Sequence, residues 1–208
     1  MVSRVFCIGR NYVEHVHEMK SEVPGSPVIF SKPPSSLVKP GEKIYFPAHG
    51  KELHHEVEVV VLIGKEGRAR TESEARDFIT GLTLGLDLTL RDVQNALKKK
   101  GLPWEISKAF EQSAPIGEFV PFDESVDLGR LSFSCSVNGM IRQKGNSKYM
   151  IFSIEALIVA LSRIWALRPG DLIFTGTPPG VGPLSPGDGI RVESEQLGSY
   201  GWDVISAA

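Results

Sequence analysis

Apolar residues are grouped along the chain in short runs, and frequent glycine and proline residues separate these runs. Runs rich in β-branched and aromatic residues predict strands over residues 57–63, 132–137, 172–175 and 190–193. Asn138-Gly139 predicts a hairpin turn directly after the second of these strands. Many short segments joined by turns favour a fold built on sheets over a helical bundle.

Helix signals are fewer, and they predict helices over residues 71–78, 88–100 and 153–167, with a shorter candidate over 12–19. Thr71 lies three residues before Glu74, which is the spacing of a capping box. Ser153 is the expected cap of the third helix, and Asn11 that of the candidate. The strands and helices together predict a β-rich α+β fold, with residues 1–208 forming one domain.

Composition and charge limit the classes of protein that fit. The chain has 208 residues, of which 41% are hydrophobic and 23% charged, as in ordinary globular proteins. The formal net charge is -2, which offers no electrostatic basis for binding nucleic acid or a membrane surface. Two cysteines, Cys7 and Cys135, are too few for a disulfide framework. We therefore expect a cytoplasmic protein with neither a nucleic acid nor a membrane as partner.

Two glutamates begin the apolar run over residues 57–63. Glu56 and Glu58 are two positions apart, so that on a strand they project to the same side. Two carboxylates on one side repel each other, and a divalent cation relieves that repulsion. The simpler interpretation is a solvated strand face. The continuous apolar run after Glu58 argues against it, because such a strand is buried on both faces.

Asp87 follows a second apolar stretch, at the point where the helix over 88–100 is expected. Taken alone, Asp87 could simply be the N-terminal cap of that helix. Together with Glu56 and Glu58, it makes a set of three carboxylates that suits Mg²⁺, or Mn²⁺ as an alternative. No group of histidines and cysteines points to zinc.

Six motifs in this order resemble the fumarylacetoacetate hydrolase family over nearly the whole chain, with the short acylpyruvase and oxaloacetate decarboxylase members as the nearest likeness. These motifs are Gly9-Arg10-Asn11-Tyr12, Ser31-Lys32-Pro33, His55-Glu56-Val57-Glu58, Gly85-Leu86-Asp87-Leu88-Thr89-Leu90-Arg91-Asp92, Gly170-Asp171 and Thr175-Gly176-Thr177-Pro178-Pro179-Gly180-Val181-Gly182. The resemblance implies a mixed β-sandwich or roll with a few peripheral helices, and a homodimer.

The resemblance also implies roles for single residues. Glu56, Glu58 and Asp87 match the metal ligands, and Lys108 matches the active-site lysine of the family. The substrate-contacting positions match Arg91, Gln94 and Thr177. Each has a simpler interpretation from its own surroundings. Lys108 would be a surface lysine, Arg91 and Gln94 a solvated helix face, and Thr177 part of a structural turn.

His15 and Glu18 are three residues apart, so that on a helix they share a face and can form a hydrogen bond. A carboxylate raises the basicity of an imidazole, as a base that activates water requires. The resemblance implies this role for both, whereas without it they would decorate an exposed helix. Gly25, between Pro24 and Pro27, could be a hinge that lets about residues 1–30 close as a lid.

These expectations combine into cleavage of the C3–C4 bond of a small 2,4-dioxo or 2-oxo acid, through a metal-stabilised pyruvate enolate. Acylpyruvate hydrolysis ranks first because His15 and Glu18 are both present, and oxaloacetate decarboxylation can use the same site. The alternatives are an isomerase or tautomerase of a 2-oxo or 2-hydroxy-dienoate or oxaloacetate, or a metal- or ligand-binding module without catalysis.

Overall fold

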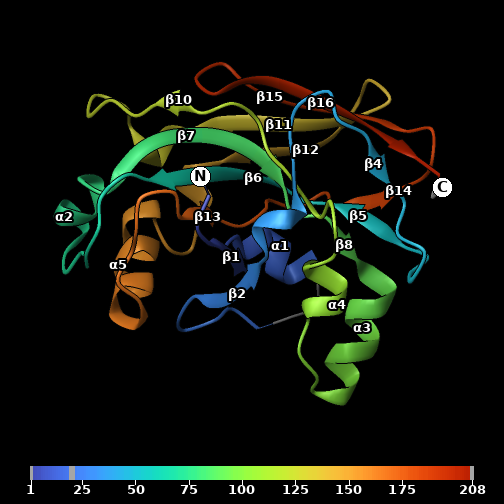
Figure 1. Cartoon of the computed structure of the whole chain (residues 1–208), viewed down its shortest axis with the longest axis horizontal. Coiled ribbons are helices and arrows are strands. Elements are labelled where there is room, and N and C mark those ends of the chain that lie inside the picture. The colour runs from blue at the N-terminus through green and yellow to red at the C-terminus, as the bar shows by residue number, and fades with distance from the viewer. Residues whose placement is uncertain (1, 19–21, 207–208) are drawn as a thin grey trace.

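The computed structural model describes residues 2–18 and 22–206, and its strands form two large and two small sheets (Figure 1). The largest sheet contains, in spatial order, β10 (Val120–Pro121), β7 (Ile79–Leu86), β6 (Val57–Ile63), β13 (Leu172–Phe174), β1 (Val5–Gly9) and β2 (Val28–Lys32). Neighbouring strands are antiparallel except β1 and β13, which are parallel. β6 and β13 are buried along almost their whole length, as their apolar sequences predict.

The second large sheet contains β12 (Met140–Asn146), β11 (Ser132–Val137), β15 (Gly189–Ser194), β16 (Gly198–Ile205) and β4 (Ile44–Tyr45). It lies over the first sheet, with β15 and β16 in contact with β7 (Figure 1). The small sheets are β14 (Gly182–Leu184) with β5 (Leu53–His55) and β8 (Thr89–Leu90), and β3 (Leu37–Val38) with β9 (Ala114–Pro115). Apolar side chains of both large sheets form the main core.

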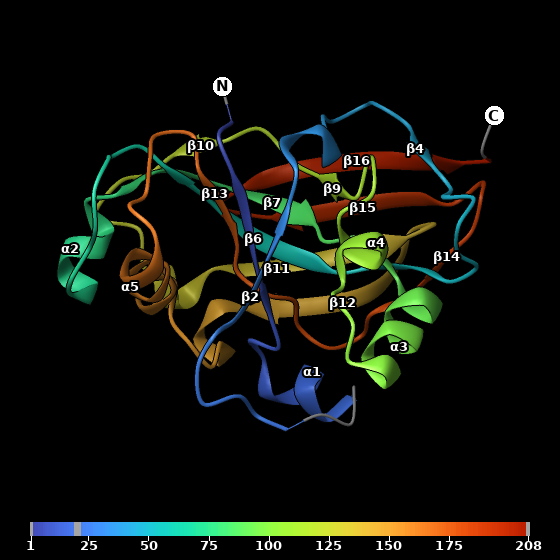
Figure 2. The same ribbon diagram turned by 60° about the horizontal axis from the view of Figure 1, so that its bottom comes forward.

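The described residues include five α-helices: α1 (Val13–Glu18), α2 (Glu72–Arg76), α3 (Arg91–Lys100), α4 (Glu105–Lys108) and α5 (Ile154–Ile164). Short 3₁₀ helices cover Pro34–Ser36, Leu128–Arg130 and Ser147–Tyr149. α2 and α5 pack together at one end of the sheets, whereas α3 and α4 lie at the other end (Figure 2). The predicted fold class, a strand-rich α+β fold with a few peripheral helices, is thus confirmed.

None of the helices within residues 2–18 and 22–206 is long and apolar enough to cross a membrane.

The predicted strands agree with the structure to within about one residue. β6 and β11 have the predicted bounds, β13 ends one residue earlier, and β15 extends one residue further at each end. Asn138 and Gly139 have φ angles of 51° and 77°, the left-handed values that a two-residue hairpin turn requires. Local sequence therefore predicts these strands well, because their runs of β-branched residues lie between turn residues.

The helices are shorter than predicted, because partners that are distant in the sequence compete for their ends. α3 begins at Arg91 because Thr89 and Leu90 pair with β5 instead. α5 ends at Ile164, and Leu167 forms backbone hydrogen bonds with Gly67. α2 covers 72–76, and the Thr71 side chain accepts a hydrogen bond from the Glu74 N–H as predicted.

The candidate helix over 12–19 is present as α1, but the prediction that Asn11 caps it is wrong. The Asn11 side chain donates to the carbonyl oxygens of Phe152 and Thr175 and accepts from the Phe152 N–H, at 2.8–3.0 Å. It therefore joins the start of α1 to two distant segments. The predicted helix end at Met19 lies outside the described residues.

Gly85 provides a test of how tightly the sheet is packed where it supports Glu58, its partner across the β6–β7 pair. A Cβ atom on Gly85 would lie 2.8 Å from Phe174 Cε1 and 2.9 Å from the Pro115 carbonyl oxygen. We expect Gly85→Ala to lower the free energy of unfolding in urea by about 1–3 kcal/mol, the usual cost of overpacking. Gly25→Ala is the control, because its Cβ would meet nothing within 4 Å. Equal stability of the two variants would contradict the prediction.

Candidate active site

Three buried carboxylates lie at one edge of the largest sheet. Glu56 joins β5 to β6, Glu58 lies within β6, and Asp87 directly follows β7. The antiparallel pairing of β6 and β7 brings the start of one strand beside the end of the other. One ligand oxygen from each carboxylate lies within 4.8 Å of the others, and the three residues are only 1–4% exposed. The predicted carboxylate set is therefore assembled, and Asp87 does not cap a helix.

Three cations balance part of this negative charge. Lys108 Nζ, at the end of α4, lies 2.8 Å from Glu56 Oε2 and 2.5 Å from Asp87 Oδ2. Lys32 Nζ, at the end of β2, lies 2.9 Å from Asp87 Oδ1. The Arg91 guanidinium donates to Glu56 Oε1. Lys108 and Arg91 are thus buried partners of the carboxylates, and the simpler interpretation of both as solvated side chains is wrong.

The two glutamates differ in their electrostatic surroundings. Burial acts to raise the pKa of Glu56, but Lys108 and Arg91 outweigh it, so that this pKa lies well below its ordinary value. Burial and the neighbouring Asp87 carboxylate instead raise the pKa of Glu58 well above its ordinary value, although the Gly176 N–H opposes this rise. In the described residues no lysine or arginine pairs with Glu58. Among the described residues Glu58 therefore has a backbone N–H but no cation as its partner.

The donor set fits a hard divalent cation. All three groups are carboxylates, and no histidine or cysteine belongs to the cluster in the part of the chain that the structure describes. Asp87 Oδ1 is buried, and the Lys32 ammonium lies 2.9 Å from it. A divalent cation among these oxygens would compensate the charge of Glu58. Glu56, Glu58 and Asp87 could thus hold a metal.

The loop after β13 holds Glu58 in place. The Gly176 N–H donates to Glu58 Oε2 at 2.7 Å. Gly176 has a φ of 102°, and a Cβ there would lie 2.6 Å from the Asn11 Cβ atom. Only glycine satisfies both constraints without strain. The Gly176 backbone can therefore approach the carboxylate closely.

His15 and Glu18 form the predicted pair on α1. His15 Nδ1 lies 3.1 Å from Glu18 Oε2, and His15 is only 6% exposed. Glu18 also accepts hydrogen bonds from the Gly180 N–H at 3.1 and 3.3 Å. Glu14 and His17, on the same helix, are exposed. His15 is thus buried, and the partly exposed Glu18 connects the pair to the loop that holds Glu58.

Arg91 and Gln94 are both buried on α3, where Arg91 Nη1 donates to Gln94 Oε1 at 2.6 Å. Thr177 is buried too, but its hydroxyl donates to the Val57 carbonyl oxygen at 2.9 Å and accepts from Gln143 Nε2 at 2.8 Å. A hydroxyl that already donates its proton has none left for a carboxylate.

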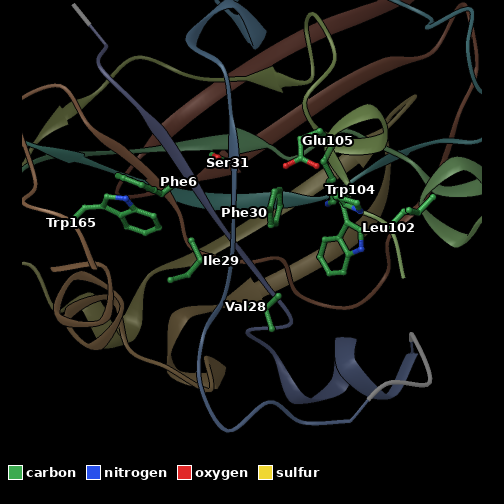
Figure 3. Close-up of a pocket in the computed structure, with 11 residues that line it drawn as sticks. Phe6, Val28, Ile29, Phe30, Ser31, Leu102, Trp104, Glu105 and Trp165 are labelled. Carbon is green, nitrogen blue, oxygen red and sulfur yellow. The ribbon is translucent and has the colours of Figure 1, made fainter. Parts of the chain in front are cut away.

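A cavity of about 40 Å³ joins these groups, and its lining includes His15, Glu56, Glu58, Arg91, Gln94, Lys108 and Thr177, together with Arg10, Lys98, Phe30 and Trp104. A larger groove of about 440 Å³ adjoins it and shares Phe30, Trp104 and Lys108 with it. Figure 3 shows Phe30 and Trp104 near each other in this groove, with Phe6 and Trp165 towards its other end. Glu56 and Glu58 line the small cavity and not the groove, so that the smaller space contains most of the chemically active groups.

Sequence reasoning gave no role to four residues that the structure brings to this site. Lys32 lies in a motif of the resemblance, which is the signal that could have indicated it. Gln143 lies in an otherwise exposed strand and has no local signal. Arg10 and Lys98 line the cavity. Arg10 belongs to a motif of the resemblance, which is a signal for it, whereas Lys98 is one of three successive lysines.

The chain belongs to the fumarylacetoacetate hydrolase family, since the family model for the fumarylacetoacetate (FAA) hydrolase C-terminal domain matches residues 4–205. The chain is 47% identical over 187 residues to the mitochondrial oxaloacetate tautomerase FAHD1 of Mus musculus, covering 90% of this chain and 85% of that protein. It is 44% identical over 189 residues to the mitochondrial oxaloacetate decarboxylase of Dictyostelium discoideum, covering 90% and 87%.

A solved structure shows the same fold with ligands bound. The fumarylpyruvate hydrolase from Pseudomonas aeruginosa, in complex with Mn²⁺ and pyruvate, superposes with a TM-score of 0.93 at 36% identity. The match covers 99% of this chain and 91% of that one. The family resemblance is therefore confirmed, and the relatives include a hydrolase, a decarboxylase and a tautomerase.

Gln143 is expected to stabilise the segments that support the site. Its carbonyl oxygen accepts from the Val57 N–H and faces His55 Nδ1, while its amide donates to Thr177 Oγ1 and the Pro178 carbonyl oxygen. Gln143→Leu would leave several of these buried groups unpaired, so that we expect it to lower the free energy of unfolding by about 3 kcal/mol. Urea denaturation measures this, with the exposed Gln196→Leu as control. A loss as small as that of the control would contradict the prediction.

Proposed function

We propose that the chain is a divalent-metal-dependent enzyme that cleaves the C3–C4 bond of a small 2-oxo or 2,4-dioxo acid, with acylpyruvate hydrolysis as its main activity. The observation that carries this proposal is the set of three buried carboxylates at Glu56, Glu58 and Asp87, together with the buried His15 and its contact with Glu18. The Mn²⁺ and pyruvate bound to the related fumarylpyruvate hydrolase support it. Mg²⁺ is the proposed metal and Mn²⁺ the alternative.

Glu56, Glu58 and Asp87 would hold the metal, which when bound would supply a Lewis acid that polarises the 2-oxo group of the substrate. Arg91 and Gln94 line the same cavity and would orient the substrate carboxylate. Because the Thr177 hydroxyl is already engaged, we assign the binding role at that position to the loop backbone. Lys108 would stabilise negative charge that develops on the 2-oxo oxygen, since its buried ammonium group lies beside Glu56 and Asp87.

The His15–Glu18 pair would activate water for hydrolysis. With its proton on Nδ1 facing Glu18, the His15 ring has a free Nε2 that can accept a proton from water. The water oxygen then bonds to C4 of the acylpyruvate. The C3–C4 bond breaks with its electron pair left on the pyruvate fragment as an enolate, which takes a proton at C3. One water and one acylpyruvate thereby become pyruvate and a carboxylic acid.

Oxaloacetate chemistry is the second candidate, because relatives 44–47% identical to the chain are described as oxaloacetate decarboxylase and oxaloacetate tautomerase. Decarboxylation produces the same pyruvate enolate with CO₂ as the other fragment, and it needs no water attack. Tautomerisation needs only proton transfer at C3. Both reactions would use the carboxylate set and Lys108, and would depend less on His15 as the base that activates water.

The contact of Glu18 with the Gly180 N–H supports a lid in which α1 closes over the cavity. We propose that about residues 1–30 include this lid and that residues 1–208 act as one catalytic unit. The homodimer stays a prediction. The cytoplasmic location also stays a prediction. The Mus musculus and Dictyostelium discoideum relatives are described as mitochondrial.

Metal binding can be measured without turnover. A ligand at 100 times its Kd stabilises a folded protein by about 2.7 kcal/mol, so that saturating Mg²⁺ should raise the melting temperature. Glu58→Gln removes a ligand charge at nearly constant volume, and we expect it to abolish this rise and the EDTA-sensitive release of pyruvate from acetylpyruvate. Glu14→Gln, on an exposed side chain, should retain both. An unchanged Mg²⁺ response in Glu58→Gln would exclude Glu58 as a ligand.

His15 can be tested by comparing two reactions. General base catalysis typically contributes 10²–10⁴-fold, so that His15→Ala should lower kcat for acetylpyruvate hydrolysis by about 10²-fold or more. Oxaloacetate decarboxylation should fall by less than about tenfold, since it requires no activated water. The exposed neighbour His17→Ala serves as the control and should leave both rates near wild type. Equal losses in the two reactions would show that His15 does not act as this base.

A further inference from the structure

The cavity beside the carboxylates is lined by more cations than those that pair with the carboxylates. Lys32, Lys108 and Arg91 already pair with Glu56 and Asp87. Two further cations, Arg10 and Lys98, line the same cavity. Among the described residues neither has a carboxylate oxygen within 4.0 Å. Their charge is thus available to an anionic group that enters the cavity.

Arg10 is held at the cavity by a constrained backbone. Its φ is 61°, in the left-handed region that arginine rarely adopts. The next residue, Asn11, is fully buried and bonded to Phe152 and Thr175, which fixes the turn between β1 and α1. The neighbouring contacts therefore enforce an unfavourable conformation, as is common at functional sites.

Lys98 differs from the two lysines that follow it. Lys99 and Lys100 are exposed, whereas Lys98 is half-buried and its Nζ lies 5.4 Å from the centre of the Trp104 ring. Burial and the nearby Arg91, Arg10 and Lys108 charges lower the pKa of Lys98 to about 8. The cations at this wall thus repel one another, and a bound anion would relieve that repulsion.

We propose that Arg10 and Lys98 form a second anion-binding subsite, which selects 2-oxo acids with a second carboxylate over those that end in a neutral group. This proposal rests on the proposed function, because the first carboxylate and the 2-oxo group would be held at the metal ligands. Arg91 and Lys108, which pair with Glu56 and Asp87, are assigned to the first carboxylate and the 2-oxo group, which leaves Arg10 and Lys98 to receive the far carboxylate. The subsite determines substrate specificity and takes no part in bond cleavage.

Two substrates that differ only at the far end test this subsite. Fumarylpyruvate ends in a carboxylate, and crotonylpyruvate has a methyl group in its place. Lys98→Met and Arg10→Asn, in which asparagine tolerates the positive φ, should each lower kcat/KM for fumarylpyruvate by about 10- to 100-fold, mainly through KM. Crotonylpyruvate should change less than about threefold, and the exposed Lys99→Met should change neither substrate. Equal losses for both substrates, or no loss, would overturn the subsite.

A binding experiment separates this proposal from the proposed reaction. Calorimetry in the presence of Mg²⁺ compares 2-oxoglutarate with 2-oxopentanoate, which has a methyl group in place of the second carboxylate. Wild type should bind 2-oxoglutarate about tenfold or more tightly, and Lys98→Met and Arg10→Asn should each reduce that preference. Equal affinities in the wild type, or no binding of either acid, would overturn the subsite. A retained preference without turnover of any substrate would overturn the proposed reaction alone.

Discussion

The burial of three carboxylates at one edge of the sheet is the constraint on which the rest of the site depends. Removing an ionised carboxylate from water costs several kcal/mol unless opposite charge compensates it. Here that charge comes from three separate elements: Lys32 ends β2, Arg91 begins α3 and Lys108 ends α4. The electrostatic requirement of Glu56 and Asp87 is thus met by the end of β2, the start of α3 and the end of α4, which lie together beside these carboxylates.

The cations are distributed unevenly around the carboxylates, and the proposed chemistry of the cavity depends on this distribution. Glu56 is held ionised by Lys108 and Arg91, whereas Glu58 has only a backbone N–H and no cation. A divalent cation fits on that side. The cavity wall with Arg10 and Lys98 instead has cations without carboxylate partners among the described residues, so that an anion would fit there. With a divalent cation bound beside Glu58, a substrate with a carboxylate at each end would be attracted to both sides.

The loop after β13 connects the separate parts of the site. The Gly176 N–H holds Glu58, the Thr177 hydroxyl bonds to Val57 and Gln143, and the Gly180 N–H holds Glu18. One short segment thus contacts the carboxylate strand, the second sheet and the helix that carries His15. α1 and the carboxylates are thus physically linked through this loop.

The sequence by itself determined the local features. The apolar run after Glu58 predicts a buried strand, Asn138-Gly139 a hairpin, and Thr71 a cap, because each depends on neighbours within a few residues. Motif order also indicated the carboxylates, although only as a resemblance. Tertiary structure decided the rest: Gln143 reaches Thr177, and Lys32 reaches Asp87, across long stretches of sequence. Asn11 has the local pattern of a cap, but its hydrogen bonds go to Phe152 and Thr175, because hydrogen bonds between distant segments form only when the sheets have packed.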